Sequence, residues 1–78
     1  MSTARDRVLT VIAAVLKLPA ATLNDRSSPD DVAVWDSLQH LQIILALEEE
    51  FDVRFQPEEI DGLQTAGGLI AAVAERMK

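Results

Sequence analysis

Seventy-eight residues leave room for one small domain, since domains usually span about 100–200 residues. Nearly half of the residues are hydrophobic (49%) and 26% are charged, a balance that excludes intrinsic disorder as the class of the chain. The net charge of -6 argues against nucleic acid and anionic membranes as partners, because both require clustered Lys and Arg, whereas basic protein partners remain compatible with it.

The residue types that are missing narrow the chemistry further. The chain has no cysteine, which excludes a disulfide, a thiolate nucleophile and a cysteine-based metal site. No apolar run approaches the roughly 20 residues of a membrane span. The first seven residues are polar and lack the apolar core of a signal peptide. We therefore expect residues 1–78 to form a single domain that is soluble, cytoplasmic and monomeric.

The first segment, residues 3–18, is expected to form an amphipathic helix. Thr3 followed by Asp6 resembles a capping pattern, and Pro19 marks the stop. Lys17 suits the negative end of the helix dipole. The apolar residues that recur at helical spacing are Val8, Leu9, Ile12, Val15 and Leu16.

Residues 19–35 form a long connection, and loops beyond about 12–15 residues usually carry structure of their own. Ser28 and Pro29, followed by two acids, favour one turn of helix. We expect Trp35 to be at least partly buried and so to fix the loop ahead of the next helix. The apolar residues expected to anchor the connection to the core are Leu23, Val32, Val34 and Trp35.

The second helix is predicted to start at Ser37, with Asp36 as its N-cap and Gln39 completing a capping pattern. A helix that is apolar over more than one stripe offers more surface than a single core needs, so part of it should be left for a partner. Its apolar face comprises Leu38, Leu41, Ile44, Leu45 and Phe51, widened by Ile43 and Leu47.

Proline, two acids and a following glycine predict a short third helix over residues 56–61. Thr65 is the expected N-cap of a fourth helix, although Gly67 and Gly68 weaken its first turn by roughly 1 kcal/mol each relative to Ala. That helix is predicted to run through Leu69, Ile70, Val73 and Met77. No segment shows the period-two alternation of a strand. The predicted fold is all-α, a small four-helix bundle with three main helices and a short third one.

Few residues are suited to catalysis. The sequence has no glycine-rich phosphate loop, no Cys/His metal spacing and no Gly-x-Ser-x-Gly elbow. Ser37 and His40 share a helix face, but a catalytic triad also needs an acid that orients the imidazole, and Asp36 caps the helix instead. We expect no catalytic and no metal-binding residues and interpret His40 as an exposed helix residue. A small hydrolase built on Ser37 and His40 is the least favoured alternative.

Ser37 stands in the first turn of the second helix, directly after the cap. Because Asp36 already supplies the capping side chain, the Ser37 hydroxyl is released from that role. Unpaired N–H groups and the positive end of the helix dipole would favour a phosphate attached there. These local features alone do not distinguish a modification site from an ordinary serine.

Acids dominate residues 36–61, which hold eight acids and one base and so carry a local charge of -7. Three consecutive glutamates near the end of the second helix stand where the dipole disfavours anions by about 0.3–1 kcal/mol each. This unfavourable placement beside apolar residues favours a docking surface for a basic partner over a merely solvated face. The acids are Asp36, Glu48, Glu49, Glu50, Asp52, Glu58, Glu59 and Asp61.

Together these residues resemble the acyl carrier protein family. The resemblance covers almost the whole chain. It rests on Asp36-Ser37-Leu38, Leu41, Leu45-Ala46-Leu47-Glu48-Glu49-Glu50-Phe51, Pro57-Glu58-Glu59, and Thr65 before the closing apolar helix.

The resemblance implies that Ser37 is the attachment site of covalent 4′-phosphopantetheine, installed from coenzyme A by a Mg²⁺-dependent phosphopantetheinyl transferase. The protein would tether acyl intermediates as thioesters and shuttle them between enzymes of fatty acid, polyketide or related specialised biosynthesis, without being an enzyme. Its partners would be the transferase and acyl-loading and acyl-processing enzymes with basic docking patches. The implied recognition surface comprises Asp36, Leu38, Leu41, Leu45, Glu48 and Glu49, with Phe55 at its far end.

Two features depart from the pattern of the family. Residues 33–35 lack the glycine that often precedes the serine, and Trp-Asp-Ser-Leu is familiar in small carriers of specialised pathways. Gln39, His40 and Gln42 stand where many fatty-acid carriers have at least one acid, so the negative surface is thinner at the serine end. A peptidyl or aminoacyl carrier, and a helical interaction module of the same fold that carries no arm, remain alternatives.

Overall fold

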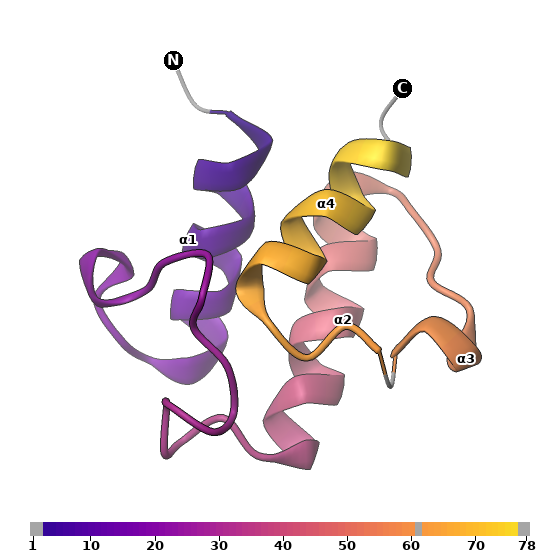
Figure 1. The fold of residues 1–78 in the computed structure, drawn as a ribbon. Helices are drawn as coiled ribbons and strands as arrows, with labels where there is room; N and C mark the ends of the chain where they lie inside the picture. Colours follow the sequence, from indigo (N-terminus) through magenta and orange to yellow (C-terminus); the bar gives the residue numbers. More distant parts are fainter. Residues whose placement is uncertain (1–2, 61, 77–78) are drawn as a thin grey trace.

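The computed structural model describes residues 3–60 and 62–76, and within these ranges it contains helices and connections but no strand. In chain order the elements are α1 (Ala4–Leu16), the 3₁₀ turn η1 (Ala20–Thr22), α2 (Ser37–Phe51), α3 (Pro57–Ile60) and α4 (Ala66–Arg76) (Figure 1). The predicted all-α architecture, with three main helices and a short third one, is confirmed. Asp61 and Met77, which the sequence-based predictions include, lie outside the described residues.

Helix α1 begins as predicted but ends earlier. Thr3 Oγ1 accepts a hydrogen bond of 3.1 Å from the N–H of Asp6, which confirms Thr3 as the N-cap. At the other end Lys17 turns into the left-handed region with φ 60°, and Leu18 N–H bonds back to Ala13 O at 2.9 Å. Lys17 is therefore the C-cap, and the helix stops before Pro19 restricts the backbone.

At residues 28–32 the connection between α1 and α2 contains a turn, but not the helical turn predicted there. The N–H groups of Asp31 and Val32 both donate to Ser28 O, at 3.0 and 2.9 Å, and the turn goes no further. The one short helical element of this connection is η1, which the sequence patterns do not predict. Leu23 and Trp35 are buried as predicted, whereas Val34 is 49% exposed, so its prediction as a core anchor is wrong.

The third and fourth helices follow their local signals. Helix α3 starts at Pro57 and ends at Ile60. Thr65 Oγ1 accepts a hydrogen bond of 3.0 Å from the N–H of Gly68, so Thr65 caps α4 as predicted. The two glycines that weaken the first turn on propensity grounds do not prevent α4 from starting at Ala66.

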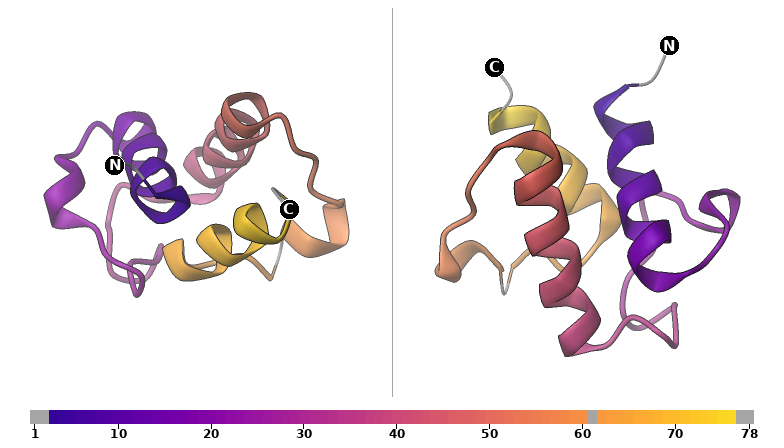
Figure 2. Two further views of the ribbon diagram at one scale, coloured as in Figure 1. Left: turned by 90° about the horizontal axis from the view of Figure 1, so that it is seen from above. Right: turned by 180° about the vertical axis from the view of Figure 1, so that it is seen from behind.

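The core lies between the three long helices. Helix α1 packs against both α2 and α4, and the view from above shows these three helices around a common interior with α3 at the outside (Figure 2). None of the helices in the described ranges has the length and apolarity needed to cross a bilayer. The largest side chains that are fully buried in the core are Trp35, Ile12, Ile43, Ile44, Leu47 and Leu69.

Candidate functional site

The start of α2 is held in place by its N-cap residue. Asp36 Oδ1 accepts a hydrogen bond of 2.9 Å from the N–H of Gln39, and Asp36 O accepts the N–H of His40 at 2.8 Å. The Asp36 side chain is exposed but is already engaged with the first turn. The capping role predicted for Asp36 is confirmed.

Ser37 is the first residue of α2 and is exposed. The cap is supplied by Asp36, so the Ser37 hydroxyl is needed neither by the cap nor by the core. The N–H groups of a first helical turn and the positive end of the dipole face this position. A negatively charged group bonded to the Ser37 oxygen would therefore be stabilised electrostatically.

An apolar stripe runs along the outer face of α2. Leu38, Leu41 and Leu45 are 62%, 51% and 61% exposed, whereas Ile43, Ile44 and Leu47 of the same helix are buried. The prediction that α2 leaves apolar surface uncovered is confirmed. The prediction that these three leucines share one face with the core residues is wrong, because the core side is centred on Ile43, Ile44 and Leu47.

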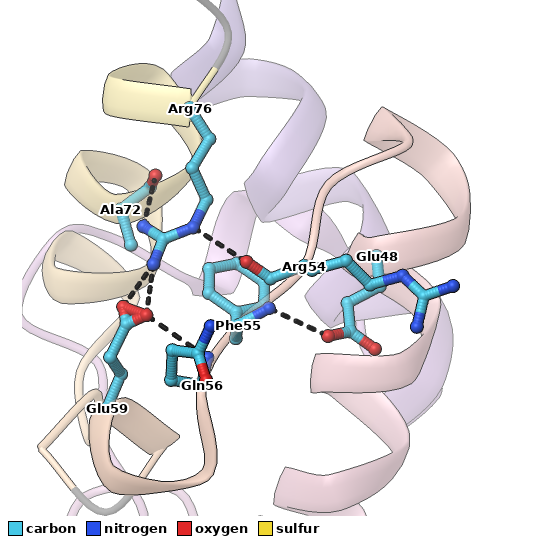
Figure 3. A network of polar contacts seen from close by, with 7 residues as sticks. All are labelled: Glu48, Arg54, Phe55, Gln56, Glu59, Ala72 and Arg76. Atoms are coloured by element: carbon cyan, nitrogen blue, oxygen red, sulfur yellow. Dashed lines mark hydrogen bonds and ion pairs between the residues drawn. The ribbon is translucent and has the colours of Figure 1, made fainter.

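Two residues expected on the recognition surface have internal roles instead. Phe55 is only 6% exposed, so its prediction as an exposed end of that surface is wrong. Glu48 is half-buried, and its Oε2 accepts the N–H of Phe55 at 2.9 Å, which ties the end of α2 to the following loop (Figure 3). Glu49, the next residue, is exposed.

Arg76 covers one face of the Phe55 ring. Its guanidinium lies 4.8 Å from the centre of the Phe55 ring, donates to Arg54 O at 2.8 Å and also bonds both carboxylate oxygens of Glu59 (Figure 3). A cation above an aromatic face with its N–H groups satisfied is a stable arrangement. The end of α4 thus closes over the loop between α2 and α3, a contact between residues too distant in the sequence for a local pattern to reveal.

The acidic surface is smaller than the charge count suggests. Glu50 pairs with Arg7 at 3.3 Å, Glu59 pairs with Arg76, and Glu48 is held by a backbone amide. Among the residues that the structure describes, no three His, Asp or Glu side chains gather as a metal site. Within residues 36–60, the acids that remain exposed beyond the cap and these pairs are Glu49, Asp52 and Glu58.

His40 differs most from its prediction. It is 7% exposed rather than a surface residue, because its ring stacks beside that of Trp35, with the ring centroids 6.0 Å apart. Trp35, which is 1% exposed and so buried as predicted, donates its indole N–H to His40 Nδ1 at 3.1 Å. The five-residue spacing of the two rings across the helix start is the one sequence signal that could have indicated this pair.

The second nitrogen of the His40 ring is buried without a partner. Within the described residues Nε2 makes no hydrogen bond, so neither ring nitrogen bonds the Ser37 hydroxyl, and the arrangement of a serine hydrolase is not formed. An indole nitrogen can only donate, so Nδ1 accepts and the neutral ring carries its proton on Nε2. A buried donor left unpaired costs about 1–3 kcal/mol.

A pocket of about 260 Å³ opens beside Ser37, between the start of α2 and α3. Its wall combines polar residues, among them Ser37 and the buried His40, with the apolar side chains of Pro29, Leu41 and Ile60. The residues that line it are Pro29, Asp36, Ser37, His40, Leu41, Ile60 and Gln64.

Comparisons with known proteins agree with this geometry. A family model described as "Phosphopantetheine attachment site" matches residues 6–73. The acyl carrier protein of Phenylobacterium zucineum (strain HLK1) is 27% identical over 77 residues, covering 99% of this chain and 98% of that protein. The acyl carrier protein of Acidothermus cellulolyticus (strain ATCC 43068 / DSM 8971 / 11B) is 29% identical over 79 residues, covering 95% of this chain and 93% of that protein.

A similar fold is also known from an experimentally solved structure. The solution NMR structure of the holo acyl carrier protein from Geobacter metallireducens superimposes with a TM-score of 0.84 at 26% identity, covering 94% of this chain and 84% of that one. Both the family model and this holo protein support a 4′-phosphopantetheine prosthetic group. Because these similarities extend over nearly the whole helical bundle, the chain belongs to the phosphopantetheine-binding acyl carrier protein family.

Proposed function

We propose that the Ser37 hydroxyl oxygen is the attachment point of 4′-phosphopantetheine and that the chain is a non-catalytic carrier of acyl groups. The observation that carries the proposal is the exposure of Ser37 at the start of α2, where Asp36 relieves it of the capping role. The segment matched by the family model, residues 6–73, includes this serine. A separate phosphopantetheinyl transferase would attach the group from coenzyme A with Mg²⁺.

In this proposal the prosthetic group and the residues of the chain have different roles. When attached, the arm supplies a terminal thiol that holds acyl groups as thioesters, and the chain itself has no cysteine to compete for them. The residues of the chain hold the attachment oxygen outside the core, and the first turn of α2 stabilises the phosphodiester charge beside it. Asp36 keeps that turn formed through its bond to Gln39.

The docking surface that we propose is centred on α2. The exposed leucines 38, 41 and 45 supply apolar contact, and Glu49 and Asp36 supply negative charge on either side of them. The partners are the transferase and cytoplasmic acyl-loading and acyl-processing enzymes with basic patches. Such charges speed the encounter more than they strengthen the complex, which suits a monomeric carrier that must be released by each enzyme in turn. Glu48 and Phe55 contribute to the fold beneath this surface instead.

The cargo is proposed as an acyl intermediate of fatty acid, polyketide or related specialised biosynthesis. Residues 33–35, just before Asp36 and Ser37, contain Trp35 and no glycine, and no acid follows the serine until Glu48. These features favour a specialised pathway over primary fatty acid synthesis. A peptidyl or aminoacyl carrier is the nearest alternative, and an interaction module without an arm is the next.

The attachment is tested by intact mass. The chain, incubated with a broad-specificity phosphopantetheinyl transferase, coenzyme A and Mg²⁺, should gain the mass of one arm. Ser37→Ala should gain nothing, whereas Ser28→Ala, which removes a serine of the preceding loop, should gain the same mass as the unchanged chain. No gain on the unchanged chain, or an equal gain on Ser37→Ala, would refute the proposal.

Two further measurements separate the alternatives. Loading the arm with malonyl or acyl donors, in parallel with amino acids and their activating enzymes, distinguishes an acyl from an aminoacyl carrier. An interaction module would perform its cellular role equally well as Ser37→Ala, whereas a carrier would lose that role entirely.

A further inference from the structure

Helix α3 is attached to the bundle less firmly than the long helices are. It spans only Pro57–Ile60, none of these residues is buried, and Ile60 is partly buried against the core. The packing between helices is made mainly by α1 with α2 and α4, and in the described part of the chain no long helix packs broadly against α3 (Figure 2). Because a helix of this length does not persist alone in water, contacts of individual side chains must keep it in place.

Arg76 of α4 is held in a fixed orientation beside α3. Its guanidinium donates to Ala72 O of its own helix at 3.1 Å and to Arg54 O at 2.8 Å, and it lies 4.8 Å from the centre of the buried Phe55 ring (Figure 3). Glu48 of α2 in turn accepts the N–H of Phe55 at 2.9 Å. These contacts are made outside α3, so Arg76 keeps its orientation whether or not α3 lies against it.

Glu59 is the side chain through which α3 reaches this arginine. Arg76 Nη2 bonds both carboxylate oxygens of Glu59, and Glu59 Oε1 also accepts the N–H of Gln56 at 3.1 Å. The side chains of Arg76 and Glu59 are 24% and 31% exposed, so water and salt screen the pair only in part. Loss of the pair would remove the charged contact between α3 and α4 and leave a single turn that does not persist alone.

We propose that the α3 segment, residues 56–60, opens locally while the three long helices stay folded, and that Arg76 controls this opening by holding Glu59. The inference concerns the chain without a prosthetic group and does not depend on attachment at Ser37. The opening nevertheless changes the surroundings of that serine, because Ile60 lines the pocket beside it. A residue at the end of α4 thereby controls the shape of the surface at the start of α2.

Opening of the α3 segment uncovers little apolar surface. Val53 and Phe55, which precede the segment, are buried and remain in the core, so Ile60 is the apolar side chain that leaves a partly buried position. A local opening of this kind has a lower free energy than global unfolding and depends only weakly on urea. The long helices carry most of the buried core residues and open only when the bundle unfolds.

Amide hydrogen exchange of the unchanged, unmodified protein at increasing urea concentration tests the local opening. The N–H groups of Gln56 and Glu59, bonded to Glu59 Oε1 and to Gln56 O, report on α3, and those of Ile44 and Leu69 report on long helices. Exchange should depend weakly on urea at the first two positions and steeply at the other two. An equal urea dependence at all four would show that α3 opens only with the whole bundle and would overturn the inference.

Two matched glutamate variants test whether the ion pair controls the opening. Glu50 also bonds an arginine that lies over a phenylalanine ring, since Arg7 is 3.3 Å from its carboxylate and 4.5 Å from the centre of the Phe51 ring. That pair joins two long helices, so the closed and open forms of α3 both retain it. In Glu59→Gln, which keeps an oxygen for the N–H of Gln56, exchange of the α3 amides should rise about fivefold, and in Glu50→Gln it should stay unchanged.

A variant on the other side of the pair completes the test. Arg76→Lys keeps the positive charge but loses the planar guanidinium over Phe55, and it should also speed exchange of the α3 amides. No rise in either Glu59→Gln or Arg76→Lys, or an equal rise in Glu50→Gln, would overturn the control by Arg76. These results do not bear on the attachment at Ser37, which the mass measurement tests separately.

Discussion

Gly67 lies in the first turn of α4, against the connection that leads to α2. Its N–H donates a hydrogen bond of 2.8 Å to Asp25 O, and a Cβ on residue 67 would lie 2.8 Å from the same oxygen. A Cβ on Gly68 would lie 3.3 Å from the side-chain oxygen Oγ1 of Thr65 and at ordinary contact distance from Leu63. The two adjacent glycines therefore differ, since only the first is required by a close backbone approach.

Substituting the two glycines separately should give effects of opposite sign. Alanine is favoured over glycine in a helix by roughly 1 kcal/mol, and Gly68→Ala should retain much of this gain. In Gly67→Ala the clash with a backbone oxygen should outweigh the gain and lower the free energy of unfolding by about 1–3 kcal/mol. Urea unfolding followed by circular dichroism measures both. Equal stabilisation by the two variants would contradict the close approach.

At the scale of elements, α3 depends on contacts from outside itself. It spans only Pro57–Ile60, and isolated helices of that length do not persist in water. Gln56 N–H donates to Glu59 Oε1 at 3.1 Å, and Arg76 of α4 bonds the same carboxylate. Because Ile60 forms part of the pocket wall beside Ser37, these contacts also support the site.

The ion pair of α3 should make stability depend on pH in acid. The backbone hydrogen bond from Gln56 lowers the pKa of Glu59 below its ordinary 4.5; partial burial opposes this and Arg76 reinforces it. Since the pKa is lower in the folded state, the stabilisation is complete above about pH 4.5 and is lost as the pH falls through the folded value. Glu59→Gln should therefore melt below the unchanged protein at pH 7, with a gap that closes towards pH 3.

Thermal unfolding at several pH values measures this gap. Glu58→Gln is the matched control, because Glu58 belongs to the same short helix but is exposed. Its melting temperature should stay close to that of the unchanged protein at neutral pH. A gap for Glu59→Gln that is the same at pH 7 and pH 3 would mean that the charge of Glu59 contributes nothing to the fold.

Helix α2 has two neighbouring glutamates that should respond differently to substitution. Glu48→Ala removes the acceptor of Phe55 N–H and should lower the free energy of unfolding by about 1–2 kcal/mol. Glu49→Ala should leave stability within about 0.5 kcal/mol, because its side chain is exposed. Glu49→Ala should instead slow association with the transferase, about two- to threefold at low salt, and the difference should vanish as salt rises.

Stopped-flow association and urea unfolding, applied to both variants, distinguish the two roles. If the association rate of the unchanged protein is flat in salt, docking is mainly apolar and runs through the exposed leucines. If Glu48→Ala keeps full stability, its bond to the loop is not required for the fold.

At the scale of the whole molecule, the helical framework can be predicted from sequence because its signals are local. Each N-cap side chain accepts a hydrogen bond from the backbone N–H three residues further along the chain. These N-cap residues are Thr3, Asp36 and Thr65. The serine at the start of α2 and the uncovered leucines follow from the same local patterns. The prediction of a four-helix bundle needs no long-range information beyond this.

The burial of individual side chains near the site depends instead on contacts between elements. His40 is buried because Trp35, from the preceding loop, packs on it, and helical periodicity carries no information about that loop. Phe55 is covered by Arg76, which lies at the far end of the next long helix. Both residues were expected at the surface because the local sequence pattern of a helix or loop carries no information about side chains that pack on it from other elements. The extent of the proposed docking surface is therefore less predictable than its centre.

The position of Trp35 has a practical consequence. It is the sole tryptophan of a chain without tyrosine, so practically all near-ultraviolet fluorescence comes from one indole. That indole is 1% exposed and is bonded to a residue lining the pocket beside Ser37. A group that entered this pocket would lie close to the emitting indole, so the proposed loading at Ser37 could be followed in solution without a dye. The bundle thus has an intrinsic fluorescent reporter next to the proposed attachment site.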